Sequence, residues 1–380
     1  MTTPAKDRLI ELDVTRAVAM IGVVLMNYHG YLILDGGQVG TSFANRVFDP
    51  WNGPLSTRFA ATFVLVAGMG VTLMTNRSRL GNDPAAVTHD RWTLLRRGVA
   101  LYAFGYVLDW IWPGTILFYY GAFFVVGAAV FNLRSRWLVL IGAAAAVSAA
   151  AVQWWAFERR AGGHRVDWLL SPSGRSPRGL LFDTFVNGTH PLLPWLAFLC
   201  AGIVLGRYLK LPFTWLPLII FGGLAVALLT YAAHGSLATT PRRAVLLSTD
   251  PFNRSLNYTI GTLGSSIAAF ATISLVCELS KRSRVTHGLA AAGRMTLTIY
   301  VLHVLVFNLV VHRLGWVRPT GLDTAWLLTL AFWVPAIVGA AWWQRRVGLG
   351  PLERVYRRFG GDEYAGRSED RRASAAKVTT

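Results

Sequence analysis

Long apolar runs without charged residues recur along this 380-residue chain and leave few folds open to it. About 20 helical residues cross the roughly 30 Å hydrocarbon core of a bilayer, where a backbone must satisfy its own hydrogen bonds. Each run therefore predicts a membrane-spanning helix, the third and fourth forming a tight pair around Pro113-Gly114. We count ten runs: 17–34, 57–76, 98–113, 115–133, 137–157, 190–206, 213–233, 258–279, 295–312 and 323–343.

The composition argues against a water-soluble globule. Only 15% of the residues are charged and 53% are hydrophobic, whereas soluble domains carry about 25% charged residues. The formal net charge is +18, but the basic residues stand in short clusters between apolar runs and form no basic stripe. We therefore predict an all-α, polytopic transmembrane bundle of about ten helices, with membrane lipids as partners and no nucleic acid.

The distribution of Lys and Arg predicts the orientation of this bundle. Cytoplasmic segments carry an excess of Lys and Arg, and with the N-terminus inside they would hold 25 of the 37. The prediction is N-in and C-in, with 1–343 forming the bundle and 344–380 a basic cytoplasmic tail, disordered over its last dozen residues. Three long loops, 35–56, 158–189 and 234–257, then lie outside, where they either bind something or cap the helices.

The first apolar run carries polar side chains that a bilayer penalises, by about 2.5 to 3.5 kcal/mol per charge on insertion scales. Asp13 and Arg16 stand three residues apart at its inner mouth, where one helical face lets them form a structural ion pair. Asn27 and His29 lie in its outer half and need hydrogen-bond partners. Residues two apart point about 200° from each other, so these two share a site only if the helix breaks near Gly30.

The ninth run places a polar stripe on one helical face. Thr296, Tyr300, His303 and Phe307 follow one another at spacings of four, three and four. A neutral imidazole at His303 is either a proton acceptor or a hydrogen-bond partner of a neighbouring helix.

Metal and thiol chemistry have no support in the sequence. No spacing of metal ligands such as HExxH occurs, so we expect no metal. Cys200 and Cys277 lie in apolar runs that disfavour a thiolate, so a cysteine acyl-enzyme is not expected. An acyl-histidine intermediate and direct transfer both stay open.

Six stretches of the chain carry a resemblance to a known family. They are RLIELDVTRAVAMIGVVLMNYHG, WNGPLSTRFAATFVLVAGMGVTL, LLRRGVALYAFGYVL, HPLLPWLAFLCAGIVLGR, GRMTLTIYVLH and GPLERVYRRF. In this order they resemble blocks of the polytopic membrane family that includes heparan-α-glucosaminide N-acetyltransferase and its YeiB-like bacterial relatives. One departure is Ala17, which stands where the family usually has Gly.

The resemblance implies an integral-membrane acyltransferase that takes an acyl group from cytoplasmic acyl-CoA, most plausibly acetyl-CoA. Arg96, Arg97 and Arg207 at inner helix ends are then expected to bind the carrier, since guanidinium groups pair bidentately with phosphate. The ordinary excess of positive charge on the inside explains the same residues without a ligand.

The resemblance also implies an acceptor on the far side of the membrane. An extracytoplasmic envelope glycan, glycolipid or metabolite is the expected acceptor. The protein itself is expected in a bacterial inner (plasma) membrane, and its self-association as a homodimer is left open. The expected acceptor-binding residues are Trp51, Asn52, His190, Trp195 and Tyr300.

The catalytic base is where the chain departs most from the family. The eukaryotic branch has a His three residues before the Trp of the Trp-Asn-Gly segment, and Phe48 stands there in this chain. Either His29 or His303 supplies the imidazole, or Asp49 acts as the base, or this branch has lost or changed the chemistry; we rank His29 first. Asn27 matches the family position for a residue that acts as general base toward the acceptor or holds the thioester carbonyl.

Two other classes of protein remain as alternatives. A transporter or lipid flippase would also be an apolar bundle with a few buried polar groups, although no internal repeat relates the two halves of this chain. A structural membrane protein without chemistry predicts that Asn27, His29 and His303 can be replaced with no loss beyond stability.

Overall fold

The computed structural model describes residues 9–81, 83–170, 176–209 and 212–361, and every regular element in these ranges is helical. All ten predicted runs fold as helices, which confirms the all-α class. The corresponding helices are α1 (Ile10–Leu34), α3 (Arg58–Gly81), α4 (Pro84–Asp109), α5 (Leu117–Val130), α6 (Ser135–Ala161), α9 (Leu192–Gly206), α10 (Leu216–Leu237), α12 (Leu256–Leu279), α14 (Thr296–Phe307) and α15 (Leu322–Arg346).

The chain is a multi-pass membrane protein by the length and hydropathy of its helices. Seven described helices are long and apolar enough to cross a bilayer, α14 being continued to Arg313 by a π-helical turn, η4 (Asn308–Arg313). An eighth span arises if α9 is counted with the segment Pro177–Asn187, which meets it at a bend of 52°. The expected ten spans are not all reached, because α4 begins with a polar stretch and α5 has only 14 residues.

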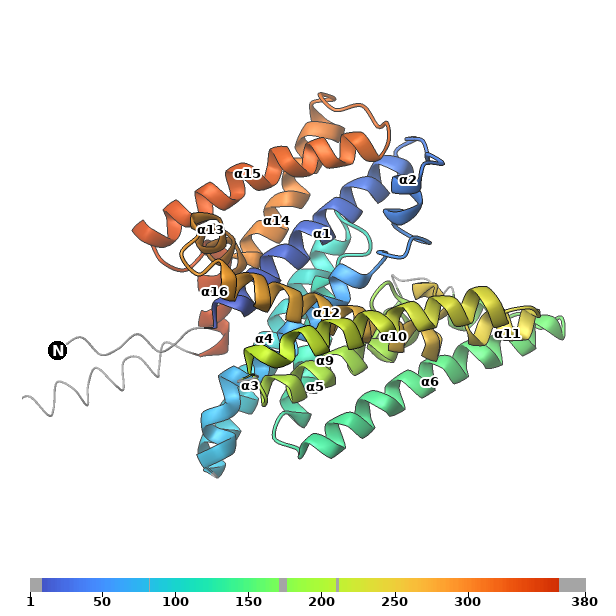
Figure 1. The fold of residues 1–380 in the computed structure, drawn as a ribbon, viewed down its shortest axis with the longest axis horizontal. Helices are drawn as coiled ribbons and strands as arrows, with labels where there is room; N and C mark the ends of the chain where they lie inside the picture. Colours follow the sequence, from blue (N-terminus) through green and yellow to red (C-terminus); the bar gives the residue numbers. More distant parts are fainter. Residues whose placement is uncertain (1–8, 82, 171–175, 210–211, 362–380) are drawn as a thin grey trace, which may run out of the picture.

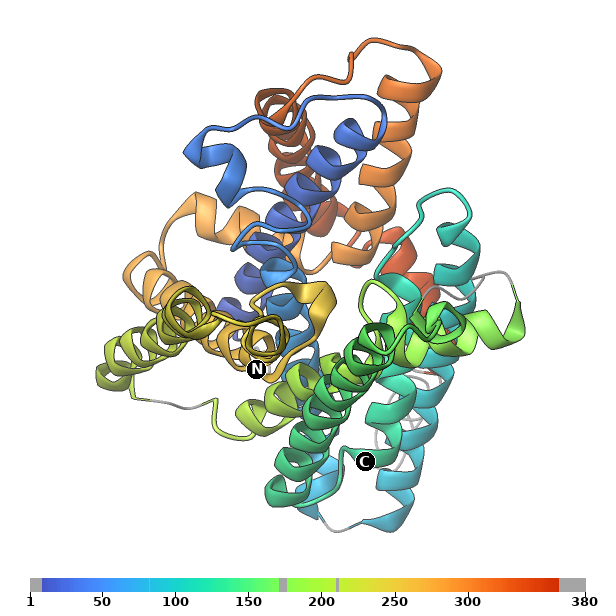
Figure 2. The same cartoon turned by 90° about the vertical axis from the view of Figure 1, so that its right-hand side faces the viewer.

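Helix α1 lies at the centre of the bundle. It packs against α3, α12, α14, α15 and the short α13 (Arg284–Gly293), and both views place α14 and α15 beside it (Figures 1 and 2). At the opposite extreme, α10 exposes Leu218, Phe221 and Leu228, a face suited to lipid. Polar groups on α1 are therefore held within protein, where they must find partners.

Glycine allows two helix pairs to approach closely. In α4 and α5, a Cβ at Gly98 would lie 2.8 Å from the carbonyl oxygen of Gly121, and Gly121 itself abuts the backbone of Tyr102. In α3 and α9, Gly68 and Gly202 each face the backbone of the other helix. Such small-residue contacts are typical of helices that associate in membranes, and the first pair is the tight pair predicted around Pro113-Gly114.

The long loops and the tail lie at opposite ends of the bundle. Figure 1 shows α2 (Phe43–Val47) and α11 (Pro241–Leu246), both from long loops, at one end, and α13 and α16 (Pro351–Gly360) at the other. Helix α16 belongs to the predicted tail, yet it packs on α4 and α14. The stretch 362–380, which contains the segment expected to be disordered, lies outside the described residues.

Candidate functional site

Two cavities open within the bundle and share a wall. The larger, which we call the Arg97 cavity, has a volume of 1070 Å³ and is lined by α1, α3, α4, α5, α14 and α16. The smaller, which we call the Asn27 cavity, has a volume of 380 Å³ and is lined by α1, α3 and the loops around Trp51, Pro113 and His190. Ile116 and Tyr300 line both cavities, so these two side chains form the wall between them.

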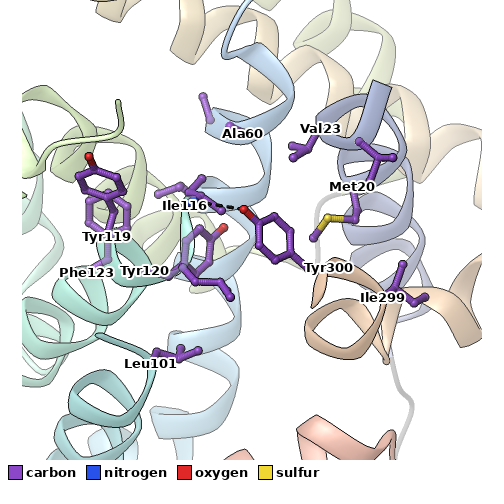
Figure 3. Packing of buried hydrophobic residues seen from close by; sticks show 14 of the residues in the cluster. Met20, Val23, Ala60, Leu101, Ile116, Tyr119, Tyr120, Phe123, Ile299 and Tyr300 are labelled. Atoms are coloured by element: carbon purple, nitrogen blue, oxygen red, sulfur yellow. Dashed lines mark hydrogen bonds between the residues drawn. The ribbon is translucent and has the colours of Figure 1, made fainter. Parts of the chain in front are cut away.

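The wall is fixed by hydrogen bonds. The Tyr300 hydroxyl accepts a hydrogen bond from the Ile116 amide at 3.3 Å and lies 2.8 Å from Thr115 Oγ1, to which it can donate its proton (Figure 3). Both wall residues are buried. Two side chains of α1 lie on opposite sides of this wall. Met20 lines the Arg97 cavity, and Val23, almost one helical turn later, lines the Asn27 cavity.

The Arg97 cavity carries the charged groups of the site. Its polar lining includes Asp13, Arg16, Arg97, Glu353 and Arg357. Asp13 is buried and accepts bonds from Arg16 Nη1 and Arg294 Nε, both at 3.0 Å, so the predicted Asp13–Arg16 pair forms. Among the described lining residues three are basic and two are acidic, so this part of the lining carries an excess of positive charge.

Helix α16 closes part of the Arg97 cavity. The Glu353 carboxylate accepts bonds from the Thr298 amide at 3.0 Å and from the Thr298 hydroxyl at 2.5 Å. The Arg97 guanidinium lies 5.3 Å from the centre of the Tyr356 ring. Arg97, Tyr356 and Arg357 therefore meet at the same cavity from helices more than 250 residues apart in the chain.

Beside the Asn27 cavity, His303 is held in one tautomer. Its Nδ1 is hydrogen-bonded to the Tyr300 carbonyl oxygen, which can only accept, so Nδ1 carries the proton in the neutral ring. Nε2 then has a free lone pair, and Asn27 Nδ2 donates to it over 3.3 Å. The imidazole is fully buried. The geometry thus places a proton-accepting nitrogen next to an asparagine that lines the cavity.

His29 lies apart from this pair. Helix α1 continues without a break through Gly30 to Leu34, so Asn27 and His29 do not share one site. His29 Nδ1 donates to the carbonyl oxygen of Phe48 at 2.8 Å, its Nε2 is buried and has no partner in the described part of the chain, and the residue lines neither cavity. The imidazole does, however, touch the backbone of the position where the eukaryotic branch has its His.

The residues expected to bind the acceptor divide into two groups. Trp51, His190 and Tyr300 line the Asn27 cavity, and His190 Nδ1 is buried with no hydrogen-bond partner in the described ranges. Asn52 and Trp195 line neither cavity; Trp195 is buried and supports the His190 ring, with centroids 4.6 Å apart.

Asp49 and Arg207 have structural contacts. Asp49 Oδ1 accepts the amide hydrogens of Trp51 and Asn52, at 2.8 and 2.9 Å, and so closes the turn that presents Trp51. Arg207 donates to the carbonyl oxygens of Phe131 and Leu133 beyond the end of α5. Arg207 and the exposed Arg96 line neither cavity, which leaves Arg97 as the one predicted carrier-binding residue that does.

Sequence reasoning missed several residues of the Arg97 cavity. Glu353, Tyr356 and Arg357 lie in the stretch interpreted as a tail, although the spacing of Glu353 and Arg357 by four residues is a helical signal. Tyr120 sits in the uniformly apolar segment LFYYGAFFVV, where no pattern distinguishes it from a packing residue.

Fold and site together define a multi-pass helical membrane protein with a basic cavity and a histidine-bearing cavity on the two sides of one wall. Residues 8–239 match the family model described as heparan-alpha-glucosaminide N-acetyltransferase, catalytic, and residues 214–360 match the model described as protein of unknown function (DUF418). The first match covers more than half of the chain, so the chain belongs to that family, and the two regions together make the YeiB-like architecture that the sequence resembles. It therefore carries a membrane N-acetyltransferase catalytic domain, of a family that uses acetyl-CoA as donor. Neither the curated proteins nor the solved structures give a match to the chain.

Proposed function

We propose that this protein transfers an acetyl-type acyl group from acyl-CoA bound in the Arg97 cavity to an acceptor bound in the Asn27 cavity. The observation that carries the proposal is the wall of Tyr300 and Ile116, which belongs to both cavities. A donor and an acceptor bound on its two sides would be separated by these two side chains alone, and transfer requires the Tyr300 side chain to turn aside so that they come into contact.

The donor side is suited to a phosphate-bearing carrier. Arg16, Arg97 and Arg357 come from three helices, and guanidinium groups bind phosphates with charge-assisted hydrogen bonds. The volume of 1070 Å³ accommodates a long ligand, and the cavity ends at the wall, where an acyl group at the tip of such a ligand would lie. Tyr356 adds an aromatic face close to Arg97.

The acceptor side is suited to a small polar molecule such as a sugar. Tyr31, Trp51 and Tyr300 supply aromatic surface, while Asn27 and His190 supply polar groups. In the reaction, the acceptor oxygen or nitrogen attacks the thioester carbon, the carbon–sulfur bond breaks, and coenzyme A leaves with the sulfur. His303 lies behind Asn27 and lines neither cavity, so its Nε2 takes the proton of the acceptor once the Asn27 amide turns from that nitrogen to hold the acceptor.

The biological setting of the proposal follows from the predicted topology. With N-in and C-in orientation the Arg97 cavity faces the cytoplasm, where acyl-CoA is made, and the Asn27 cavity faces outward. The acceptor is then an envelope glycan, a glycolipid or an extracytoplasmic metabolite, in a bacterial plasma membrane. Membrane lipids surround the bundle, and a homodimer is compatible with this arrangement.

The test is binding of acetyl-CoA to the purified protein in nanodiscs. We expect saturable binding that Arg97→Ala weakens by about ten-fold or more, because a hydrogen bond to a charged group contributes about 1.5–3 kcal/mol. The adjacent Arg96→Ala is the matched control, since Arg96 is exposed and lines neither cavity.

Three outcomes of this binding experiment distinguish the acyltransferase from the alternatives. Loss of binding in Arg97→Ala alone supports the acyltransferase. Equal losses in both variants would point to general charge attraction and contradict the Arg97 cavity as the donor site. No acyl-CoA binding by the unaltered protein would refute the proposed function, and solute or lipid transport across the same two cavities would then be assayed.

A further inference from the structure

One hydroxyl group at the closed end of the Arg97 cavity has no partner. Tyr120 lines this cavity, and its hydroxyl is buried with no hydrogen bond to any described residue. Leaving a buried polar group unpaired costs free energy, so such groups are rare in folded proteins unless a ligand or water supplies the partner.

The position of Tyr120 relates it to the wall. Tyr120 follows Ile116 by one helical turn at the start of α5, and Figure 3 shows its hydroxyl turned towards Ile116 and Tyr300. The Tyr300 hydroxyl already has two hydrogen-bond partners, Thr115 and Ile116, whereas the Tyr120 hydroxyl has none among the described residues. Tyr120 is therefore the hydroxyl at the wall that is left to donate to a ligand.

The identity of that ligand group follows from its surroundings. Around Tyr120 the lining includes the apolar side chains of Met20, Phe63, Leu101 and Ile116, and Arg16 is the lining charge whose electrostatic field reaches the Tyr120 hydroxyl. A phosphate or carboxylate would lose its hydration against such apolar surface, whereas a neutral carbonyl needs only one donor.

We infer that Tyr120 donates a hydrogen bond to the carbonyl oxygen of the acyl thioester, and that the wall of Ile116 and Tyr300 limits the length of the acyl chain beyond it. The inference rests on the proposed function, because it places the acyl end of the carrier whose phosphates the arginines bind. It assigns to this site a short neutral acyl group.

The experiment compares two ligands that differ only at this point, acetyl-CoA and free coenzyme A. In the unaltered protein in nanodiscs we expect acetyl-CoA to bind about five-fold more tightly than coenzyme A, the effect of one hydrogen bond. Tyr120→Phe removes only the oxygen and should bring the ratio of the two affinities to about one.

Tyr119→Phe is the matched control in the same helix. The Tyr119 hydroxyl donates to Asp183 at 3.2 Å and accepts from the Thr189 amide at 2.9 Å, and Tyr119 lines neither cavity. This variant should lower the melting temperature and keep the affinity ratio. Tyr120→Phe should leave the melting temperature of the ligand-free protein unchanged or raise it.

The wall gives a second readout. Ile116→Ala removes side-chain volume from it, so the affinity for hexanoyl-CoA should rise several-fold relative to that for acetyl-CoA.

The outcomes distinguish this inference from the proposed function. If acetyl-CoA and coenzyme A bind equally well to the unaltered protein, or if Tyr120→Phe keeps the preference, the Tyr120 assignment is overturned while the donor site stands. If neither ligand binds, the proposed function fails and the inference fails with it.

Discussion

Replacement of His303 by Gln is the sharpest test of how the site works. In the folded protein the ring accepts from Asn27 at 3.3 Å, is bonded to the Tyr300 carbonyl and is fully buried. Gln preserves much of the volume and the hydrogen-bonding capacity, so we expect the folded protein to persist. Gln has no nitrogen that can accept a proton at neutral pH. A positioned general base contributes about 10²–10⁴-fold to a rate, or about 3–5 kcal/mol of barrier, so turnover of the His303→Gln variant should fall by that factor.

His29→Gln is the matched comparison, because that ring also makes one bond through Nδ1 to a carbonyl oxygen and is equally buried. Loss of one such bond costs about 1 kcal/mol of stability in either variant. Neither histidine lines a cavity, but His303 is bonded to Asn27, which does, whereas the hydrogen bond of His29 goes to Phe48, which does not. Turnover of the His29→Gln variant should therefore stay within a few-fold of the unaltered protein.

The assay follows release of coenzyme A from acetyl-CoA in nanodiscs, with glucosamine as the first acceptor probe because the family is described by a glucosaminide. Thermal unfolding of each variant, measured in parallel, separates loss of fold from loss of chemistry. The reasoning would be refuted if His29→Gln abolished turnover while His303→Gln retained it. That result would make His29 the base beside the Phe48 backbone.

Three further substitutions test the framework of the site. Gly202→Val should lower the stability by about 1–3 kcal/mol, because its side chain would enter the α3 backbone at Leu65, whereas the open Gly235→Ala should not; equal melting temperatures would contradict the close α3–α9 contact. Asp13→Asn should cost several kcal/mol, since it leaves Arg16 and Arg294 without their shared carboxylate. The exposed pair of Glu278 and Lys281 contributes about 0–1 kcal/mol, so a similar loss in Glu278→Gln would count against this reasoning. Glu353→Gln should weaken the docking of α16 on Thr298 and expose α16 to limited proteolysis; an unchanged digestion pattern would show that other contacts hold this helix.

Hydropathy was sufficient to predict the long helices of the fold, but not the short helices α13 and α16. An uncharged run has only one way to satisfy its backbone in lipid, so each of the ten runs became a helix. Local spacing also predicted the Asp13–Arg16 pair, because residues three apart meet on one helical face. The number of spans was harder to predict, because α4 begins with a polar stretch and the short α5 packs by glycine contacts on the second half of α4, at Gly98 and Gly121.

The candidate site could be predicted only in part, because its contacts join residues far apart in the sequence. Asn27 and His303 are 276 positions apart, and each sequence segment alone indicates only a polar group that needs a partner. His29 ranked above His303 because it adjoins Asn27 in sequence. An unbroken helix turns such neighbours to different faces, so nearness along the chain does not bring Asn27 and His29 into one site.

The two matched regions of the chain acquire complementary roles from this geometry. The region matched by the acetyltransferase model supplies Arg16, Arg97, Asn27 and the α5 side of the wall, whereas His303, Tyr300 and α16 lie in the region matched by the model of unknown function. Neither region alone encloses either cavity, since Tyr300 lines both and α16 closes part of the larger one. The second region is therefore part of the site, and substitutions at Tyr300, His303 or Glu353 should impair ligand binding or turnover as directly as substitutions in the catalytic domain.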